Sequence, residues 1–160
     1  MAGEGRTRDA ITEEGLTALR AEIADLEGPG RTAMAARIKA ARELGDLKEN
    51  AEYHIAKDDQ AHLETRIKHL RGKLRDSIVV AVDEDADSFA FGRTAEVLDE
   101  STGKVHAWTL VGSTEANVAT GQISAESPVG KALRDSPVGA QVKVETPGGE
   151  KLLRVQKLLD

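Results

Sequence analysis

Apolar residues recur at helical spacing in two stretches of the first half of the chain. The first set keeps steps of three and four residues: Leu16, Leu19, Ile23 and Leu26. The second set has the same spacing: Leu63, Ile67, Leu70 and Leu74. Each set therefore lies on one face of a helix. Two such faces joined by a short break predict an antiparallel coiled-coil hairpin over residues 12–76, with Thr12 as the N-cap of its first helix.

Two glycine-containing segments interrupt the helical pattern. Gly45-Asp46 is the expected connection between the helices, since glycine suits the end of one helix and aspartate caps the start of another. Gly28-Pro29-Gly30 falls inside the first helix. Proline costs about 3 kcal/mol in a helix interior and each glycine about 1 kcal/mol, so we expect a kink or a local break there.

The charge pattern agrees with a hairpin that turns at Gly45-Asp46. Such a turn places residue i opposite roughly residue 95 − i. The acid-free run from Arg66 to Arg75 then faces Glu22, Asp25 and Glu27. We expect ion pairs between the helices to occupy much of this basic run.

The second half of the chain changes to short, strand-like segments rich in valine and threonine. The expected strands are 78–82, 94–98, 105–111, 141–146 and 152–158. Ser127-Pro128 marks the start of one short helix over 129–134. The fold class is therefore α+β: a flexible N-terminus over 1–11, the coiled-coil hairpin over 12–76 with its tip at 45–52, and a small antiparallel β-sheet domain with one short helix over 77–160.

Composition removes several classes of function. The 160 residues carry a net charge of −6, which argues against a generally basic nucleic-acid-binding surface. There is no cysteine, so disulfides and thiol chemistry are excluded. The only aromatic residues are Tyr53, Phe89, Phe91 and Trp108, so any aromatic-lined pocket must be built from these four. With no signal peptide or membrane span in the pattern, a cytoplasmic protein without membrane contact is expected.

The expected tip of the hairpin is acidic and permits two interpretations. Asp46 and Glu49 have the spacing of a capping box, in which both carboxylates bond backbone amides at a helix start. Two carboxylates on one turn at an exposed tip are also suited to a shared Mg²⁺ ion. This ion typically takes one or two protein carboxylates and completes its shell with water and a phosphate-bearing partner. Local spacing alone leaves both interpretations open.

The tip sequence resembles that of a known protein family. Residues 41–54, Ala-Arg-Glu-Leu-Gly-Asp-Leu-Lys-Glu-Asn-Ala-Glu-Tyr-His, are similar to the tip signature of the Gre-type bacterial transcription elongation factors, most of all the GreA type. The resemblance extends over residues 12–158. It includes Arg66-Ile67, Phe91-Gly92-Arg93-Thr94, Leu110-Val111-Gly112, residues 123–124 and 127–133, and Thr146-Pro147-Gly148-Gly149-Glu150. The Gly28-Pro29-Gly30 interruption departs from the family pattern.

The resemblance implies a function on another enzyme. Gre-type factors insert their coiled coil into the secondary channel of RNA polymerase and stimulate the polymerase to cleave the 3′ end of backtracked nascent RNA. The family's two tip carboxylates fall on Asp46 and Glu49, which would help hold the second catalytic Mg²⁺ only with polymerase bound. The chain would then be an activator and not itself an enzyme. The alternative is a non-cleaving regulator or inhibitor that occupies the same channel.

Further site residues follow from the same resemblance. Arg42, Lys48 and Lys57 are expected to contact the RNA or the channel. The expected tip supports are Gly45, Asn50 and Tyr53. The second domain resembles the FK506-binding-protein-like (FKBP-like) domain of these factors, which docks on the polymerase rim. Its expected docking residues are Ile123, Ser124, Ser127 and Pro128, with turn formation and helix capping as the alternative for this segment. The resemblance also implies a monomer that holds no metal stably by itself.

Overall fold

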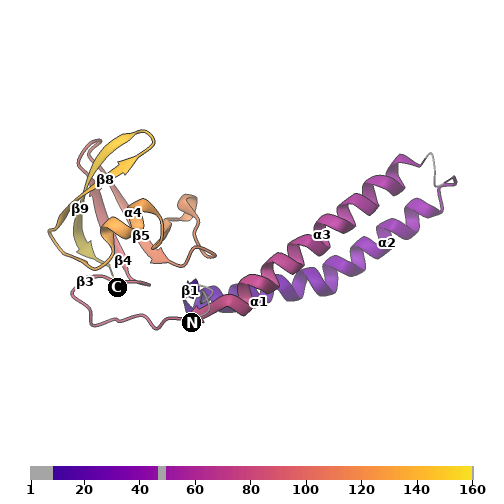
Figure 1. The fold of residues 1–160 in the computed structure, drawn as a ribbon, viewed down its shortest axis with the longest axis horizontal. Helices are drawn as coiled ribbons and strands as arrows, with labels where there is room; N and C mark the ends of the chain where they lie inside the picture. Colours follow the sequence, from indigo (N-terminus) through magenta and orange to yellow (C-terminus); the bar gives the residue numbers. More distant parts are fainter. Residues whose placement is uncertain (1–8, 47–49, 160) are drawn as a thin grey trace, which may run out of the picture. The chain divides into compact units, whose positions relative to one another are not determined.

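The computed structural model of the chain describes residues 9–46 and 50–159 (Figure 1). The chain divides into two compact units. A helical unit covers Leu16–Asp76, and a globular unit joins the N-terminal residues through Gly15 to the chain from Ser77 onward. The predicted α+β class, a helical hairpin followed by an antiparallel-rich sheet domain, is confirmed. In the part of the chain that the structure describes, no helix is long and apolar enough to cross a membrane.

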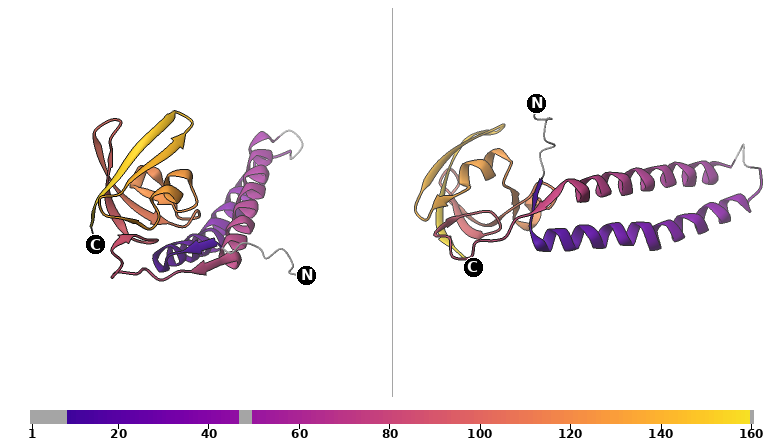
Figure 2. Two further views of the ribbon diagram at one scale, coloured as in Figure 1. Left: turned by 60° about the vertical axis from the view of Figure 1, so that its left-hand side comes forward. Right: turned by 60° about the horizontal axis from the view of Figure 1, so that its bottom comes forward.

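The helical unit is a two-arm hairpin. Its first arm contains α1 (Glu13–Asp25), the π-helical turn η1 (Leu26–Gly30) and α2 (Arg31–Arg42); its second arm is α3 (Ala51–Asp76). The two arms lie side by side in Figure 1 and in the right-hand view of Figure 2. Four residues of the predicted apolar faces are buried in this unit: Leu19, Ile23, Ile67 and Leu70. The burial of these four follows from the heptad-like spacing in the sequence. Ile38, Ala41 and Ala56, which the pattern did not predict, are buried as well.

The Gly28-Pro29-Gly30 segment forms the π-helical turn η1. Asp25, Gly30 and Arg31 all keep right-handed helical angles, and the Arg31 N–H donates to the Leu26 carbonyl five residues before it. The predicted interruption is therefore a local widening of the helix, and the chain stays helical through it. Pro29 is exposed and has no N–H to donate, so the wider turn is where the helix accommodates it.

The globular unit is built on a five-stranded sheet in the order β6-β5-β4-β9-β8. Its strands are β4 (Thr94–Asp99), β5 (Lys104–Val111), β6 (Gln122–Ser124), β8 (Gln141–Thr146) and β9 (Gly149–Leu158). All neighbours are antiparallel except β5 and β6, which run parallel. The short helix α4 (Pro128–Leu133) adds the fully buried Leu133 to the core. The aromatic ring of Phe89 is also fully buried in this core.

Four short strands lie outside this sheet, and the sequence pattern predicted only one of them, β2. β3 (Ser88–Phe89) pairs with β7 (Ser136–Pro137). β1 (Asp9–Ile11) pairs in parallel with β2 (Ser77–Val79), so the strand predicted for 78–82 is shorter and belongs to a separate two-stranded sheet. The flexible terminus predicted for 1–11 is wrong for residues 9–11: the Ile11 side chain is fully buried. Residues 1–8 lie outside the described part.

Two acidic residues close one corner of the sheet. Glu100 accepts a 2.7 Å hydrogen bond from Arg154 and another from Gln141, and these bonds lower the pKa of its carboxyl group. Burial of Asp99 opposes its ionisation. The Ser101 amide and the Lys151 ammonium group outweigh that burial, and they lower the pKa of Asp99 as well. Both carboxylates are therefore held in the charged form by their neighbours.

Candidate functional site

The first arm of the hairpin ends in a turn that requires glycine. α2 closes at Arg42, and Leu44 N–H donates to the Ala41 carbonyl at 3.2 Å. Gly45 follows with a φ of 125°, a value that side-chain-bearing residues rarely adopt. A Cβ at Gly45 would meet no atom within 4 Å, so the backbone angle alone requires glycine there. This turn directs the chain into the tip.

The second arm begins later than the capping-box interpretation requires. α3 starts at Ala51, and the Tyr53 N–H donates to the Asn50 side-chain oxygen at 3.0 Å, which makes Asn50 the N-cap. The Asn50 amide nitrogen donates in turn to the Ala41 carbonyl at 2.5 Å. The prediction that Asp46 caps the second helix is therefore wrong. That helix begins five residues further on, and Asn50 satisfies its first amide.

Asp46 is exposed and lies outside both helices. It is the last described residue before residues 47–49, so Lys48 and Glu49, two of the predicted site residues, lie outside the described part of the chain. Because Asn50 caps α3, Asp46 is not the N-cap of that helix. Its position is exposed, and an ionised carboxylate is an acceptor-only oxygen ligand.

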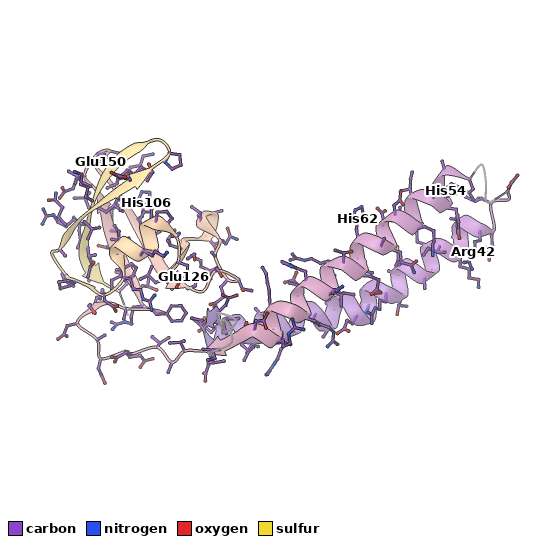
Figure 3. The ribbon with its side chains drawn as sticks, viewed as in Figure 1. Arg42, His54, His62, His106, Glu126 and Glu150 are labelled. Carbon is purple, nitrogen blue, oxygen red and sulfur yellow. The ribbon has the colours of Figure 1, made fainter. Side chains whose placement is uncertain are left out.

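The basic residues near the tip have different surroundings. The Arg42 guanidinium carbon lies 5.8 Å from the centre of the Tyr53 ring, close enough for a cation–π interaction. The Tyr53 ring also meets His54 edge to face at 5.7 Å. Arg42 and His54 lie at the same end of the hairpin, where α2 and α3 meet the tip (Figure 3). Lys57, further along α3, donates a 2.9 Å hydrogen bond to Gln60.

Four arginines of the hairpin form ion pairs between its arms. Among the described residues these pairs are Arg31–Glu64 at 2.9 Å, Arg37–Asp59 at 2.6 Å, Arg66–Glu22 at 2.8 Å and Arg71–Glu27 at 2.5 Å. The hydrogen bond from Arg31 lowers the pKa of Glu64 and raises that of Arg31. The predicted ion pairing of the Arg66–Arg75 run is confirmed for Arg66 and Arg71. These pairs fix the alignment of the arms, and as exposed pairs they add little stability each.

An apolar groove lies beside the tip, and sequence reasoning missed it. It has a volume of about 300 Å³ and is lined by Arg37, Ala40, Ala41, Leu44, Glu52 and Ile55. Leu44 and Ile55 are more than half exposed. The only sequence feature that indicated this groove was the presence of two apolar residues, Leu44 and Ile55, outside the apolar faces of the helices.

The predicted docking residues of the globular unit mostly have structural contacts. Ile123 is 6% exposed and belongs to the core, so its side chain is not available to a docking partner. Ser127 is the N-cap of α4: its hydroxyl accepts the Gly130 N–H at 3.1 Å and donates to the Ser124 carbonyl at 2.6 Å. Pro128 is exposed at the first position of that helix. The capping interpretation of this segment is thus confirmed for Ser127.

The described residues contain no cluster that resembles a complete metal site. Over residues 9–46 and 50–159, no group of three or more histidine, aspartate or glutamate side chains is arranged to hold an ion. Of the two predicted metal-binding carboxylates, only Asp46 belongs to the described residues. Two carboxylates fit Mg²⁺ only when a partner supplies further oxygen ligands.

Comparison with protein families identifies the class to which this fold and tip belong. The family model described as "Transcription elongation factor, N-terminal" matches residues 10–79. The model described as "Transcription elongation factor, GreA/GreB, C-term" matches residues 84–159. Together the two models cover both units of the structure. The chain therefore belongs to the GreA/GreB family of transcription elongation factors.

Individual relatives agree over nearly the full length. The chain is 42% identical over 152 residues to the transcription elongation factor GreA of Nautilia profundicola, covering 94% of each protein. It is 39% identical to GreA of Geobacillus kaustophilus, covering 91% of this chain and 92% of that one. Among solved structures, the crystal structure of GreA factor homolog 1 (Gfh1) from Thermus thermophilus is 26% identical, with a TM-score of 0.42, and covers 94% of this chain and 98% of that one. The chain is thus a transcription elongation factor of the Gre type.

Proposed function

We propose that this protein stimulates RNA polymerase to cleave the 3′ end of backtracked nascent RNA, by bringing Asp46 and Glu49 to the polymerase active centre through the secondary channel. The observation that carries the proposal is the position of Asp46. It is exposed, follows the turn at Gly45 and lies between the two arms of the hairpin, outside both helices. An exposed carboxylate at the end of a two-helix hairpin suits delivery into a narrow channel.

The chain supplies ligands and leaves the chemistry to its partner. A second Mg²⁺ at the polymerase centre would activate the attacking water of a two-metal cleavage. Asp46 and Glu49 would contribute anionic oxygens to this ion, which keeps other positions for water and phosphate. Since a carboxylate pair is an incomplete ligand set, the protein would act as an activator and would retain no metal after release.

Arg42 is the basic residue best placed to meet RNA in this proposal. Its guanidinium lies against the Tyr53 ring, which limits the orientations of a long and otherwise mobile side chain. A guanidinium offers planar paired donors that match a phosphate group. Arg31 and Arg37 are committed to Glu64 and Asp59, so we assign them to the hairpin and not to RNA.

Transcript cleavage by backtracked polymerase complexes tests this function. The wild-type protein with Mg²⁺ should release short 3′ RNA fragments, and Asp46→Asn combined with Glu49→Gln should abolish them without weakening polymerase binding. Glu52→Gln is the matched control, an exposed acid in the first turn of α3 that the proposal does not use. Undiminished cleavage by the double variant would contradict the role of the two carboxylates. Tight binding of the wild-type protein without fragments would identify a non-cleaving regulator instead.

A further inference from the structure

The carboxylate of Glu115, 103 residues after Thr12, accepts hydrogen bonds at the start of α1. Thr12 N–H donates to Glu115 Oε2 at 3.1 Å, and the Thr12 hydroxyl donates to Glu115 Oε1. The same hydroxyl accepts the Gly15 N–H at 3.0 Å, which confirms Thr12 as the predicted N-cap of α1. Glu115 thus extends the helix cap with a negative charge, which a helix N-terminus favours.

Glu115 also bonds its own segment of the globular unit. Its Oε2 accepts the Gly112 N–H at 2.9 Å, and Gly112 follows directly after the last residue of β5. A single carboxylate therefore joins three donors from two segments 103 residues apart. These bonds connect the root of α1, together with β1, to the end of a strand in the five-stranded sheet.

Two glycines leave room for this junction. A Cβ at Gly15 would lie 2.0 Å from Glu115 Oε1, and a Cβ at Gly112 would lie 1.9 Å from the Ala10 carbonyl oxygen. Both distances are far below van der Waals contact. Gly15 is in a helix, where glycine costs about 1 kcal/mol relative to alanine. The close approach of Glu115 gives a reason for a residue that the helix itself disfavours.

We propose that Glu115 is a positioning residue for the tip, acting through Thr12 and the first turn of α1. This inference rests on the proposed function, in which Asp46 must reach one place while the rest of the protein is bound. β1 and β2 form a separate sheet, so their pairing alone does not connect the root of α1 to the five-stranded sheet. The Glu115 junction supplies a connection to β5, and without it the start of the helix is held less firmly.

A stability test that needs no polymerase isolates the junction. In the wild-type background, Gly15→Ala should lower the unfolding midpoint, because the new methyl group displaces the Glu115 carboxylate. In a Glu115→Ala background the same substitution should raise the midpoint, because only the better helix propensity of alanine remains. Gly72→Ala in α3 is the control, since a Cβ there meets only Arg75 at 3.7 Å and should raise the midpoint in both backgrounds. An equal effect of Gly15→Ala in both backgrounds would overturn the junction.

The effect of Glu115 on tip position is tested by measuring the rate of transcript cleavage at increasing concentrations of this protein. Glu115→Ala and Thr12→Val should lower the maximal cleavage rate about tenfold or more with little change in the half-saturating concentration. Misplacement on the order of 1 Å far from the chemistry can cost about 100-fold in rate. Thr12→Ser, which keeps the hydroxyl, should restore the rate. A raised half-saturating concentration with an unchanged maximal rate would instead indicate loss of folded protein and contradict the positioning role.

The two experiments separate the possible failures. If the wild-type protein releases no fragments, the proposed function fails, and the tip-positioning role fails with it. The reversal of the Gly15→Ala effect is then still expected from the junction itself. If the wild-type protein is active and the reversal is absent, only the inference about Glu115 fails.

Discussion

Asn50 makes two hydrogen bonds with one side chain at the start of α3. Its amide oxygen accepts the Tyr53 N–H, and its amide nitrogen donates to the Ala41 carbonyl in the opposite arm. An amide can do both, because it carries an acceptor and two donors. The residue therefore caps its own helix and also joins the last turn of α2 to the first turn of α3. The end of α2 and the start of α3 are thus held together on either side of the tip.

Replacement of Asn50 should separate these two contributions. Asn50→Ala removes both bonds and should lower the free energy of unfolding of the hairpin by about 1–2 kcal/mol, as for other lost caps. Asn50→Asp keeps the acceptor for Tyr53 N–H and loses the donor, so its effect should be smaller. Tyr53 is the single tyrosine, and urea unfolding followed by tyrosine fluorescence measures the change. Equal losses in both variants would show that the cap contributes nothing.

The stability of the globular unit should fall in acid because of Glu100. The bonds from Arg154 and Gln141 lower its folded-state pKa below the ordinary value of 4.5. Their contribution is therefore complete above that ordinary value and is lost as the pH falls through the lower folded-state pKa. Glu100→Gln should flatten this part of the profile. The measurement is urea unfolding between ~pH 3 and ~pH 6, followed by fluorescence of the single tryptophan. Parallel profiles for the two proteins would exclude Glu100.

The sequence predicted the turn at Gly45 and did not predict the hydrogen bonds of Asn50 that join the two arms next to it. Gly45 could be predicted because a chain reversal after a helix favours glycine. Asp46 and Asn50 are both good N-caps, and local spacing favoured the first. The bond from Asn50 to Ala41 joins residues on different arms, and it is not visible until the arms are paired. For the same reason, Glu115 at the root of α1 had no local signal.

The first arm has one residue more than a regular heptad spacing of its buried residues allows, and the π-helical turn η1 accommodates this extra residue. The buried residues Ile23 and Ile38 are fifteen positions apart, one more than two heptads. In a uniform helix the extra residue would rotate Ile38 away from α3. The wider π-helical turn at Leu26–Gly30 restores the phase, as insertions in helices commonly do. Glu27 within this turn pairs with Arg71, which holds the turn against the opposite arm.

Deleting Pro29 should therefore be tolerated or stabilising. It restores the two-heptad spacing and removes a proline from the helix interior, which together should raise the unfolding midpoint of the hairpin. Pro29→Ala, which keeps the extra residue, should raise it less. Deleting the exposed Ala61 from α3 is the control, because it rotates Ile67 and Leu70 off the buried face and should destabilise strongly. Equal destabilisation by both deletions, seen by circular dichroism, would contradict the role of η1.

The long elements could be predicted from sequence and the shortest could not. The hairpin and strands β4, β5, β8 and β9 extend over enough residues to show their periodicity. β3, β6 and β7 have only two or three residues each, too few for any pattern. β1 pairs with β2 far along the chain, so no local feature marked residues 9–11 as ordered. The β2 prediction overran because an apolar run continues past the paired residues.

At the scale of the whole molecule, the helical unit is an insertion between two parts of the globular unit. The globular unit contains residues up to Gly15 and from Ser77 onward, whereas the sequence interpretation placed the boundary only at residue 76. The β1–β2 pair brings the two parts together at Asp9–Ile11 and Ser77–Val79. The N-terminal residues from Asp9 are thus part of the globular fold, with Ile11 as their buried contribution.

This division predicts which unit depends on Ile11. Ile11→Ala should lower the stability of the globular unit by about 2–5 kcal/mol, the usual cost of truncating a buried isoleucine. Ile78→Ala, on the paired strand and 39% exposed, should cost less. The change should be seen in the urea transition followed by Trp108, and much less in that followed by Tyr53. The opposite order would assign residue 11 to the hairpin.

The turn at η1 also has a consequence for comparing relatives. A hairpin whose first arm has one residue fewer needs no other change to pack against the same second arm, because the missing residue comes out of Leu26–Gly30. A sequence alignment should therefore open its gap there, even when an identity a few residues away scores better. Insertion or deletion of a single residue at Leu26–Gly30 would then leave the residues of the first arm that contact α3 unchanged.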